Sequence, residues 1–445
     1  MQLETIDIGK IVNGGYGLAH LASGQVVLVR HVLPGETVIV DIEETRKNSP
    51  FAQVRQIVIP HPARRTPPCP YAGECGGCDL QHCEYPGQLE IKKGIVIDLL
   101  ERSNRQTLRD CLPLIAEPLP ALEEFSYRQR LRLQVDKRGV LGFHRFQSHT
   151  LIPITACLLA RPGLNHTLTV LRADPEGHKL NSLASEVEVQ ENPHNNKTVV
   201  IFRLPRKARP ADILTAERFA RGNDSVDRIF FSGEHFSLMG PYGGKEGMAA
   251  GNVLGVHYPA IAGLSGDLHL NWEAGGFCQV NLQQNRFLIE TVLTFCQAEK
   301  GLKILDLYCG MGNFAIPLAL LGAEVLGIEG QGSAIRSAKN NAARAGLPHA
   351  RFQQSPIHTA CSELTANGAR FDCVVIDPPR QGAPELAGQL AILTGKRLVY
   401  ISCDPATLCR DLVALVQQGF SIKKIQPLDM FPQTHHIETV VLLEK

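Results

Sequence analysis

The 445-residue chain lacks an excess of charge of either sign, and it lacks any apolar run long enough to span a bilayer. Forty-five Lys and Arg stand against 44 Asp and Glu, so a net charge of +1 gives no global field that would indicate a nucleic-acid partner. The opening residues Met1–Thr5 have neither the basic nor the apolar region of a secretory signal. We therefore expect a cytoplasmic protein without a membrane partner.

Internal repeats and low-complexity tracts are also absent, which excludes solenoid and low-complexity classes. A chain of 445 residues is too long for one core of ordinary size. Its length predicts about three domains.

Cysteine is the residue type that stands out, because 13 is an odd number and four cysteines crowd between residues 69 and 83. Cys69, Cys75 and Cys78 have a metal-type spacing, and a fourth ligand would come from nearby Cys83 or distant Cys157. All-cysteine ligation suits zinc or an iron-sulfur cluster, and the spacing alone leaves both open.

The first 60 residues contain short β-rich runs at 25–29 and 36–42, separated by Gly-rich turns, and this pattern predicts a small barrel. Prolines between 60 and 68 indicate a linker. Apolar residues at near-helical spacing over 88–105 predict one amphipathic helix.

Residues 125–275 contain β-like runs at 130–135, 198–202 and 228–231, which predict a second, sheet-rich domain. Arg128, Arg130 and Arg132 alternate along the first of these runs. In a strand they would share one face, which is either a phosphate-binding surface or an ordinary solvated sheet face.

After residue 275, apolar strands alternate with helical stretches. The expected strands are 303–307, 324–328, 371–376 and 397–401. This alternation predicts a doubly wound sheet, in which ligands bind outside the carboxyl ends of the strands.

The first of these strands ends in Asp306 and Leu307 and runs into the Gly-rich segment Tyr308–Phe314, and Glu329 ends the next strand. Such glycines let a ligand approach the backbone, and an acid at the position of Glu329 can accept a ribose hydroxyl. The third glycine of a dinucleotide motif is replaced by Ala315, which favours S-adenosylmethionine over NAD. The alternative is an ordinary glycine turn.

Cys403 follows the strand expected at 397–401, and Asp377 with two prolines follows the strand before it. A free cysteine is more often a core residue than a nucleophile. A thiolate is needed, however, to add to carbon 6 of uracil and make carbon 5 nucleophilic. The proton on carbon 5 then requires a base, for which Glu438 is the candidate and His435 and His436 are rivals.

Five ordered motifs together resemble the RNA uracil-5-methyltransferase family, closest to its bacterial 23S ribosomal RNA branch, and the resemblance spans nearly the whole chain. These motifs are Cys69-x5-Cys75-Gly76-Gly77-Cys78-Asp79-Leu80-Gln81-His82, Phe277-Cys278-Gln279-Val280-Asn281, Asp306–Phe314, Ser402–Leu408 and Asp429–Pro432.

The resemblance implies a β and α/β multidomain protein. Its expected parts are an N-terminal OB-type TRAM barrel for RNA (1–60), a central α+β domain with a [4Fe-4S] cluster (61–84 and 116–275), a helical segment packed on the C-terminal domain (85–115), and a Rossmann-like methyltransferase domain with a doubly wound sheet (276–445).

The same resemblance implies particular roles for residues. Cys403 would be the nucleophile and Glu438 the base. Cofactor and uracil would contact Gln279, Tyr308, Gly310, Asn313, Glu329 and Asp377. The cluster ligands would be Cys69, Cys75, Cys78 and Cys157, although Cys83 stays an alternative to Cys157. Relatives often have an acid near the adenine where this chain has Gln354 and Ser355.

The resulting hypothesis is S-adenosylmethionine-dependent methylation of carbon 5 of a uridine in 23S ribosomal RNA by a monomer with no obligate protein partner. Arg128, Arg130 and Arg132 would help hold the RNA. One alternative is a transfer RNA uridine methyltransferase. Another is a non-catalytic RNA-binding protein whose iron-sulfur cluster senses redox state.

Overall fold

A computed structural model of the chain describes residues 3–42, 50–103, 105–243 and 251–445. The chain folds into two compact units. Unit 1 comprises residues 1–124, 379–387 and 401–441, and unit 2 comprises residues 125–378, 388–400 and 442–445. Among the described residues, no helix combines the length and apolar character needed to cross a membrane.

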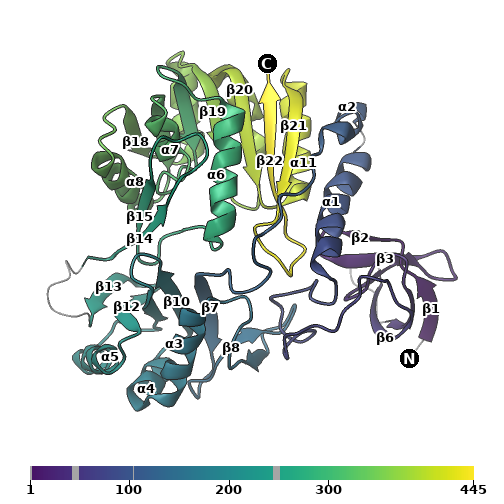
Figure 1. Cartoon of the computed structure of the whole chain (residues 1–445), viewed down its shortest axis with the longest axis vertical. Helices are drawn as coiled ribbons and strands as arrows, with labels where there is room; N and C mark the ends of the chain where they lie inside the picture. Colours follow the sequence, from purple (N-terminus) through teal and green to yellow (C-terminus); the bar gives the residue numbers. More distant parts are fainter. Residues whose placement is uncertain (1–2, 43–49, 104, 244–250) are drawn as a thin grey trace. The chain divides into compact units, whose positions relative to one another are not determined.

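Unit 1 begins with a six-stranded sheet, drawn in purple and blue in Figure 1. Its order is β1 (Leu3–Asp7), β5 (Thr37–Ile42), β6 (Phe51–Ile59), β4 (Val26–Val29), β3 (Tyr16–His20) and β2 (Lys10–Val12). Along β4 and β5, buried side chains alternate with partly exposed ones, as expected of strands with one face in a core. The predicted β-rich N-terminal region is confirmed.

The core of this sheet continues into the helix that follows. Leu80, Cys83, Ile91 and Ile95 belong to the same buried cluster as the strand residues. Helix α1 (Tyr85–Glu101) begins three residues before the predicted helix because Pro86 is well suited to the first helical turn. Short elements α2 (Gln106–Arg109) and η1 (Leu112–Leu114) follow it.

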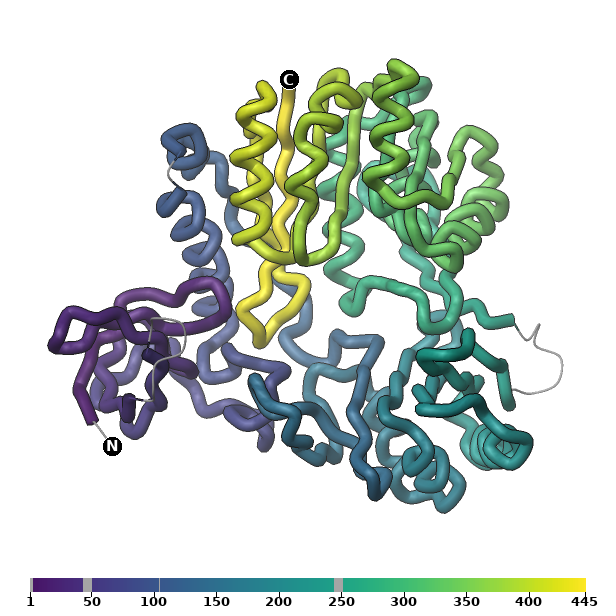
Figure 2. The backbone as a smooth tube through the Cα atoms, turned by 180° about the vertical axis from the view of Figure 1, so that it is seen from behind, coloured from purple at the N-terminus to yellow at the C-terminus, as the bar shows by residue number. Residues whose placement is uncertain are grey.

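Two helices of unit 1 that are far apart in sequence pack against each other. They are α1 and α11 (Pro405–Gln417), which lie side by side in Figures 1 and 2. The helical segment after the cysteine loop thus contacts the C-terminal part of the chain.

Unit 2 begins with a seven-stranded sheet of order β13 (Phe236–Tyr242), β12 (Val226–Gly233), β11 (Lys197–Arg203), β10 (Glu186–Asn192), β7 (Arg130–Val135), β8 (Leu141–His144) and β9 (Leu151–Pro153). The helices of this region are α3 (Pro162–Ala173), α4 (Pro175–Leu183) and α5 (Pro210–Gly222). The three strands expected here from the sequence are confirmed.

A two-stranded hairpin, β14 (Val253–Tyr258) and β15 (Leu268–Glu273), precedes helix α6 (Leu282–Cys296). The next sheet has the order β18 (Ala350–Gln354), β17 (Glu324–Glu329), β16 (Lys303–Leu307), β19 (Phe371–Ile376), β20 (Thr394–Ser402), β22 (Glu438–Glu444) and β21 (Ser421–Leu428). Strands β18 to β20 pair in parallel. Strand β20 contributes residues to both units. Its residues up to Tyr400 belong to unit 2, and those from Ile401 onward belong to unit 1.

Helices connect these parallel strands, which is the doubly wound arrangement predicted. They are α7 (Ala315–Leu320), α8 (Gly332–Arg344), α9 (Ile357–Ala366) and α10 (Ala387–Leu393), with the short turn η2 (Pro384–Leu386) before the last. Within unit 2, α6 lies in front of the strands in Figure 1, and green helices lie in front of them when the view is reversed in Figure 2.

All four strands expected in this sheet are present, but the sequence does not predict β18, β21 and β22. Strand β18 buries only Ala350 and Phe352, so it carries little apolar signal. Strand β22 is buried on both faces, and a continuous apolar run of this kind has no strand periodicity.

Candidate active site

In unit 2, a sharp turn at the carboxyl end of β16 leaves the backbone open to a ligand. Tyr308 has a φ of 61°, which is uncommon for a residue with a side chain. Gly310 and Gly312 have φ values of 54° and 89°, and a Cβ atom on Gly310 would meet nothing within 4 Å. The Gly312 N–H closes the turn on the Cys309 carbonyl at 2.8 Å. The predicted Gly-rich segment is therefore a tight turn with an uncovered glycine.

Glu329 ends β17 and is joined to this turn. One of its carboxylate oxygens accepts from the Gly310 N–H at 3.3 Å and the other from the Gln331 N–H at 2.8 Å. Gln354, at the end of β18, donates to the Gly330 carbonyl at 3.3 Å, and the buried Ser355 donates its N–H to the Glu329 carbonyl. Glu329, which is predicted to bind the ribose, therefore lies around the same loop as Gln354 and Ser355, the two residues considered for contact with the adenine.

Two further carboxyl groups lie where β16 and β19 end. Leu307 pairs with Ile376, and the Asp377 N–H donates to the Leu307 carbonyl at 3.3 Å. Burial raises the pKa of Asp377 to about 7. Burial also raises the pKa of Asp306 well above its usual value, and the charges of Asp377 and Glu329 raise it further. Asp306, which the sequence places in the motif without a role, is thus a buried carboxyl close enough to Asp377 and Glu329 for their charges to raise its pKa.

The predicted contacts Gln279 and Asn313 come from segments on either side of β16. Asn313 and Asn285 of α6 exchange two amide hydrogen bonds of 2.9 Å each, and Asn285 also donates to the Tyr258 hydroxyl at 2.8 Å. The Gln129 side chain donates to the Gln279 carbonyl at 2.7 Å. Asn285 and Gln129 position these residues, and no motif in the sequence points to them.

Cys403 lies in unit 1, at the corner between β20 and α11. Asp404 caps the helix by accepting from the N–H groups of Ala406 and Thr407 at 2.9 and 3.0 Å. The Ser402 hydroxyl also donates to the Asp404 carbonyl at 3.0 Å. These bonds fix the backbone on both sides of the half-buried Cys403 thiol.

Other cysteines of the C-terminal half are less suited to nucleophilic chemistry. Burial raises the pKa of Cys278 and of Cys409 to about 12, and that of Cys361 to about 11. A thiol with such a pKa is protonated near neutral pH and is inert. Cys403 and Cys409 are half-buried, whereas Cys278 and Cys361 are buried.

Glu438 is the first residue of β22 and is 4% exposed. Strands β20 and β22 are neighbours in the sheet. Cys403 directly follows β20, and Glu438 begins β22. The two candidate catalytic residues, both in unit 1, therefore come from adjacent strands.

The loop before Glu438 is held by buried polar contacts to α1. The Lys92 ammonium pairs with the Asp429 carboxylate, both side chains being fully buried, and also donates to the Phe431 carbonyl at 3.0 Å. Gln433, with a φ of 71°, donates its N–H to Gln88 at 2.9 Å and accepts from the Gln88 side chain at 3.0 Å. A helix distant in sequence thus fixes the approach to Glu438.

The two histidines of this loop are poor rivals as bases. His435 forms an ion pair with Asp79, which occupies its ring nitrogen Nδ1. The pKa of His436 is lowered to about 3, first by burial and then by the charges of His435 and Arg380. An imidazole with so low a pKa binds a proton weakly, which leaves Glu438 as the better candidate.

The cysteine loop lies in unit 1, with Cys69, Cys75 and Cys78 as half-buried thiols outside any disulfide. The Cys75 N–H donates to the Tyr71 carbonyl at 2.9 Å, and the Cys69 N–H donates to the Gln81 side-chain oxygen at 3.3 Å. Three partly exposed thiols in one short loop fit cluster ligation.

Cys83 and Cys157, the two alternatives for a fourth ligand, differ in their surroundings. Cys83 is 1% exposed in the core of the N-terminal sheet, where a Cβ atom on Gly87 would lie 2.7 Å from its sulfur, and burial raises its pKa to about 11. The Cys157 thiol is half-buried, and two hydrogen bonds of 2.9 Å with Asn165 hold its backbone. Ligands must be thiolates, so Cys83 is the less suitable of the two.

The expected arginine face is largely engaged within unit 2. Arg130 and Arg132 of β7 pair with Glu188 of β10 at 2.6 and 3.1 Å, and Arg132 also contacts Glu186. The Arg132 side chain is 54% exposed and that of Arg130 only 14%. Arg128 precedes β7, lies in bridges to Ala160 and Asn281, and has its guanidinium 5.9 Å from the Tyr127 ring. Arg132 is the member best placed to meet a phosphate.

The parallel sheet, the Gly-rich turn after β16 and the acid that ends β17 define a methyltransferase of the S-adenosylmethionine-dependent fold class. Family models match in two places. Residues 2–54 match the TRAM domain, and residues 265–445 match the family described as tRNA (Uracil-5-)-methyltransferase. The N-terminal six-stranded sheet thus belongs to a region similar to TRAM domains, as predicted.

Relatives match over the full length. The 23S rRNA (uracil(1939)-C(5))-methyltransferase RlmD of Shewanella sp. strain MR-4 is 32% identical over 99% of this chain and 95% of its own. The protein of the same name from Shewanella amazonensis is 33% identical over 100% of this chain and 96% of its own. The chain belongs to the RNA uracil-5-methyltransferase family.

A solved structure supports the same assignment. The tRNA (uracil-54, C5)-methyltransferase of Pyrococcus abyssi, in complex with S-adenosyl-L-homocysteine, is 25% identical and has a TM-score of 0.71. The match covers 98% of this chain and 99% of the Pyrococcus chain. The resemblance inferred from the five sequence motifs is thereby confirmed.

Proposed function

We propose that this protein transfers a methyl group from S-adenosylmethionine to carbon 5 of a uridine in 23S ribosomal RNA. The observation that carries the proposal is the pair Cys403 and Glu438, two residues of unit 1 at the ends of neighbouring strands. The names of the Shewanella relatives favour 23S ribosomal RNA as the substrate.

Cys403 would act first. Its thiolate adds to carbon 6 of the uracil, which makes carbon 5 a nucleophile. A thiolate is favoured at a helix N terminus, and Cys403 lies two residues before the first turn of α11. S-adenosylmethionine supplies the electrophilic methyl group, and carbon 5 takes that group while the sulfonium becomes a neutral thioether.

Glu438 would complete the reaction. It removes the proton of carbon 5, and the electrons of that bond restore the carbon 5–carbon 6 double bond as the Cys403 thiolate leaves. Its place at the start of β22, behind a loop held by Lys92 and Gln433, supports a fixed position for the carboxylate. The target base would have to leave its stack to reach these groups.

Cofactor binding is assigned to the unit 2 residues around the turn after β16. Glu329 would accept hydrogen bonds from the ribose, and the uncovered backbone of Gly310 would let the nucleoside approach closely. Asn313, Gln279, Tyr308 and Asp377 would contact the remainder of the cofactor or the uracil. A sulfonium cation bound nearby would favour the ionised forms of Asp377 and Asp306, whose burial otherwise favours the neutral forms.

We further assign a [4Fe-4S] cluster to Cys69, Cys75, Cys78 and Cys157. The support is the donor set, because all four are half-buried thiols whereas Cys83 is packed in the barrel core. Bound there, a cluster would supply cross-links between parts of the chain that are far apart in sequence. The methyl transfer described above requires nothing else of it.

RNA contacts are assigned to the TRAM barrel and to the exposed guanidinium of Arg132, with Arg130 and Arg128 as its support. A transfer RNA substrate is the second candidate, because the Pyrococcus abyssi tRNA enzyme matches 98% of this chain, barrel included. The presence of a TRAM barrel therefore does not separate the two substrate classes.

Nucleoside mass spectrometry of RNA separates them. Ribosomal and transfer RNA are isolated from cells with and without the gene, and 5-methyluridine is measured in each. The proposal predicts that 5-methyluridine is lost from 23S ribosomal RNA alone. Loss from transfer RNA alone would establish the second candidate, and no change in either would refute both.

A further inference from the structure

The hairpin of β14 and β15 carries an unassigned cluster of metal-binding side chains. Along the hairpin, apolar residues face inward on one side, among them Val256, Tyr258 and Leu268, which are buried. Because side chains alternate along a strand, His257 and His269 point to the other, exposed side. The alternation along the two strands therefore places both imidazoles on the exposed side of the hairpin.

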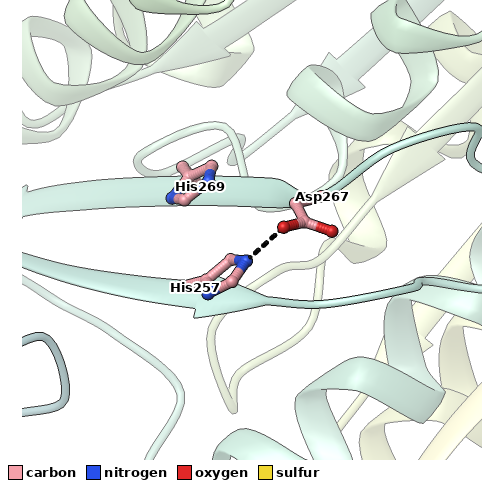
Figure 3. Close-up of side chains that lie close together, drawn as sticks. All are labelled: His257, Asp267 and His269. Carbon is pink, nitrogen blue, oxygen red and sulfur yellow. Dashed lines mark hydrogen bonds and ion pairs between the residues drawn. The ribbon is translucent and has the colours of Figure 1, made fainter.

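These imidazoles face each other and an adjacent carboxylate. His257 and His269 are direct cross-strand partners, and their rings stack with centroids 4.4 Å apart and planes within 3°. Asp267, just before β15, accepts a hydrogen bond from His257 Nε2 at 2.7 Å, as Figure 3 shows. One donor atom from each of the three residues lies within 4.8 Å of the other two.

The chemistry of this donor set is specific. Two imidazoles and one carboxylate are the protein ligands of many zinc sites that keep a fourth position for water. The Asp267 carboxylate already lies against a ring nitrogen of His257, so the donor groups are brought together before any ion binds. The side chains of His257 and Asp267 are 44% and 53% exposed, so an ion can reach them from solvent.

We propose that His257, Asp267 and His269 bind one divalent transition-metal ion of the zinc class, with water in the remaining coordination position. The ion joins the end of β14 to the start of β15 and so closes the loop of residues 259–266. That loop is already tied to α6, because Ala262 donates to Glu290 at 2.9 Å and Arg286 donates to the Ala260 carbonyl at 2.8 Å. A bound ion would fix the loop at both ends.

This metal site is distinct from the cofactor residues of unit 2 and does not depend on them. The side chain of His257 bonds to Asp267, within the hairpin, and not to the Gly-rich turn after β16. The hairpin reaches the cofactor residues through Tyr258, whose hydroxyl accepts from Asn285. The ion is thus expected to order the hairpin rather than to take part in methyl transfer.

The test measures zinc bound to the full-length, untagged protein after dialysis against excess Zn²⁺ and removal of loosely bound ions. Wild type is compared with His257→Ala and His269→Ala, and His358→Ala is the control because His358 is an exposed histidine on α9. Any zinc that binds to the cysteine loop contributes equally to the zinc content of all four proteins, because none of the substitutions changes that loop. Circular dichroism establishes that each variant is folded.

Wild type and His358→Ala are expected to hold one more zinc ion per chain than His257→Ala and His269→Ala. Hydrogen exchange is expected to slow in residues 253–273 when Zn²⁺ is added to wild type, and to stay unchanged in the two hairpin variants. Equal zinc contents in all four proteins would overturn the proposal, as would an equal loss in the His358 variant. Slowed exchange in the hairpin variants would overturn it too.

Discussion

The buried pair of Lys92 and Asp429 offers a sharp test of how the loop before Glu438 is held. Both side chains are fully buried, and burial lowers the pKa of Lys92 while the Asp429 carboxylate beside it raises it. Lys92→Met removes the cation and leaves a buried carboxylate without its counter-charge. Breaking a buried pair in this way costs about 3–5 kcal/mol.

Urea unfolding of the full chain, followed by circular dichroism, measures that loss. Lys93→Met is the matched control, because Lys93 pairs with Glu117, whose side chain is 83% exposed. Exposed pairs contribute about 0–1 kcal/mol, so this variant should unfold close to wild type. Methylation should fall in the Lys92 variant and not in the Lys93 variant.

The double variant Lys92→Met with Asp429→Asn tests the same reasoning from the carboxylate side. Removing the stranded carboxylate should restore a large part of the lost stability, because the amide needs no counter-charge. Equal unfolding of Lys92→Met and Lys93→Met would refute a stabilising role for the buried pair. A double variant less stable than Lys92→Met alone would refute it as well.

Three other predictions concern the cluster, the pH response and the RNA. Cys78→Ala should abolish iron binding in anaerobically purified protein, while Cys83→Ala should keep it, and iron loss in both would contradict the ligand assignment. Burial lowers the pKa of His82 from 6.5 to about 4, so its neutral form stabilises the fold above about pH 6.5 and this contribution is lost as the pH falls toward 4. His82→Asn should therefore lose less thermal stability than wild type between about pH 7 and 5, and an equal loss would refute this. Arg132→Gln should weaken RNA binding and lower its salt slope by about one, whereas Glu188→Gln should not weaken it, and unchanged binding by the Arg132 variant would remove it from the interface.

The sequence predicts much of the fold where local patterns are strong. Parallel strands such as β16 and β19 are short apolar runs that end in recognisable turns, and the predicted bounds lie close to the observed ones. Strand β18 escapes prediction because it buries only Ala350 and Phe352, so that its strand conformation comes from pairing with β17 and not from its own residues.

The candidate site shows the same division. Cys403 and Glu329 are visible in the sequence because they stand at the ends of apolar runs, whereas Glu438 is a candidate because the reaction needs a base and the family resemblance gives it that role. Lys92 cannot be found there as a support of the Glu438 loop, because its partner Asp429 is 337 positions away in the sequence. The arginine run of β7 has the spacing of a shared face but gives no sign of Glu188, which lies on another strand.

The central claim is that Cys403 forms a covalent bond to uracil that is released only after Glu438 removes the carbon 5 proton. Glu438→Gln is incubated with 23S ribosomal RNA and S-adenosylmethionine, and the protein is digested and examined by mass spectrometry. We predict a peptide with Cys403 joined to methylated uridine, which is absent when Cys403→Ala is combined with Glu438→Gln. An adduct on another cysteine, or full turnover by the Glu438 variant without an adduct, would contradict the claim.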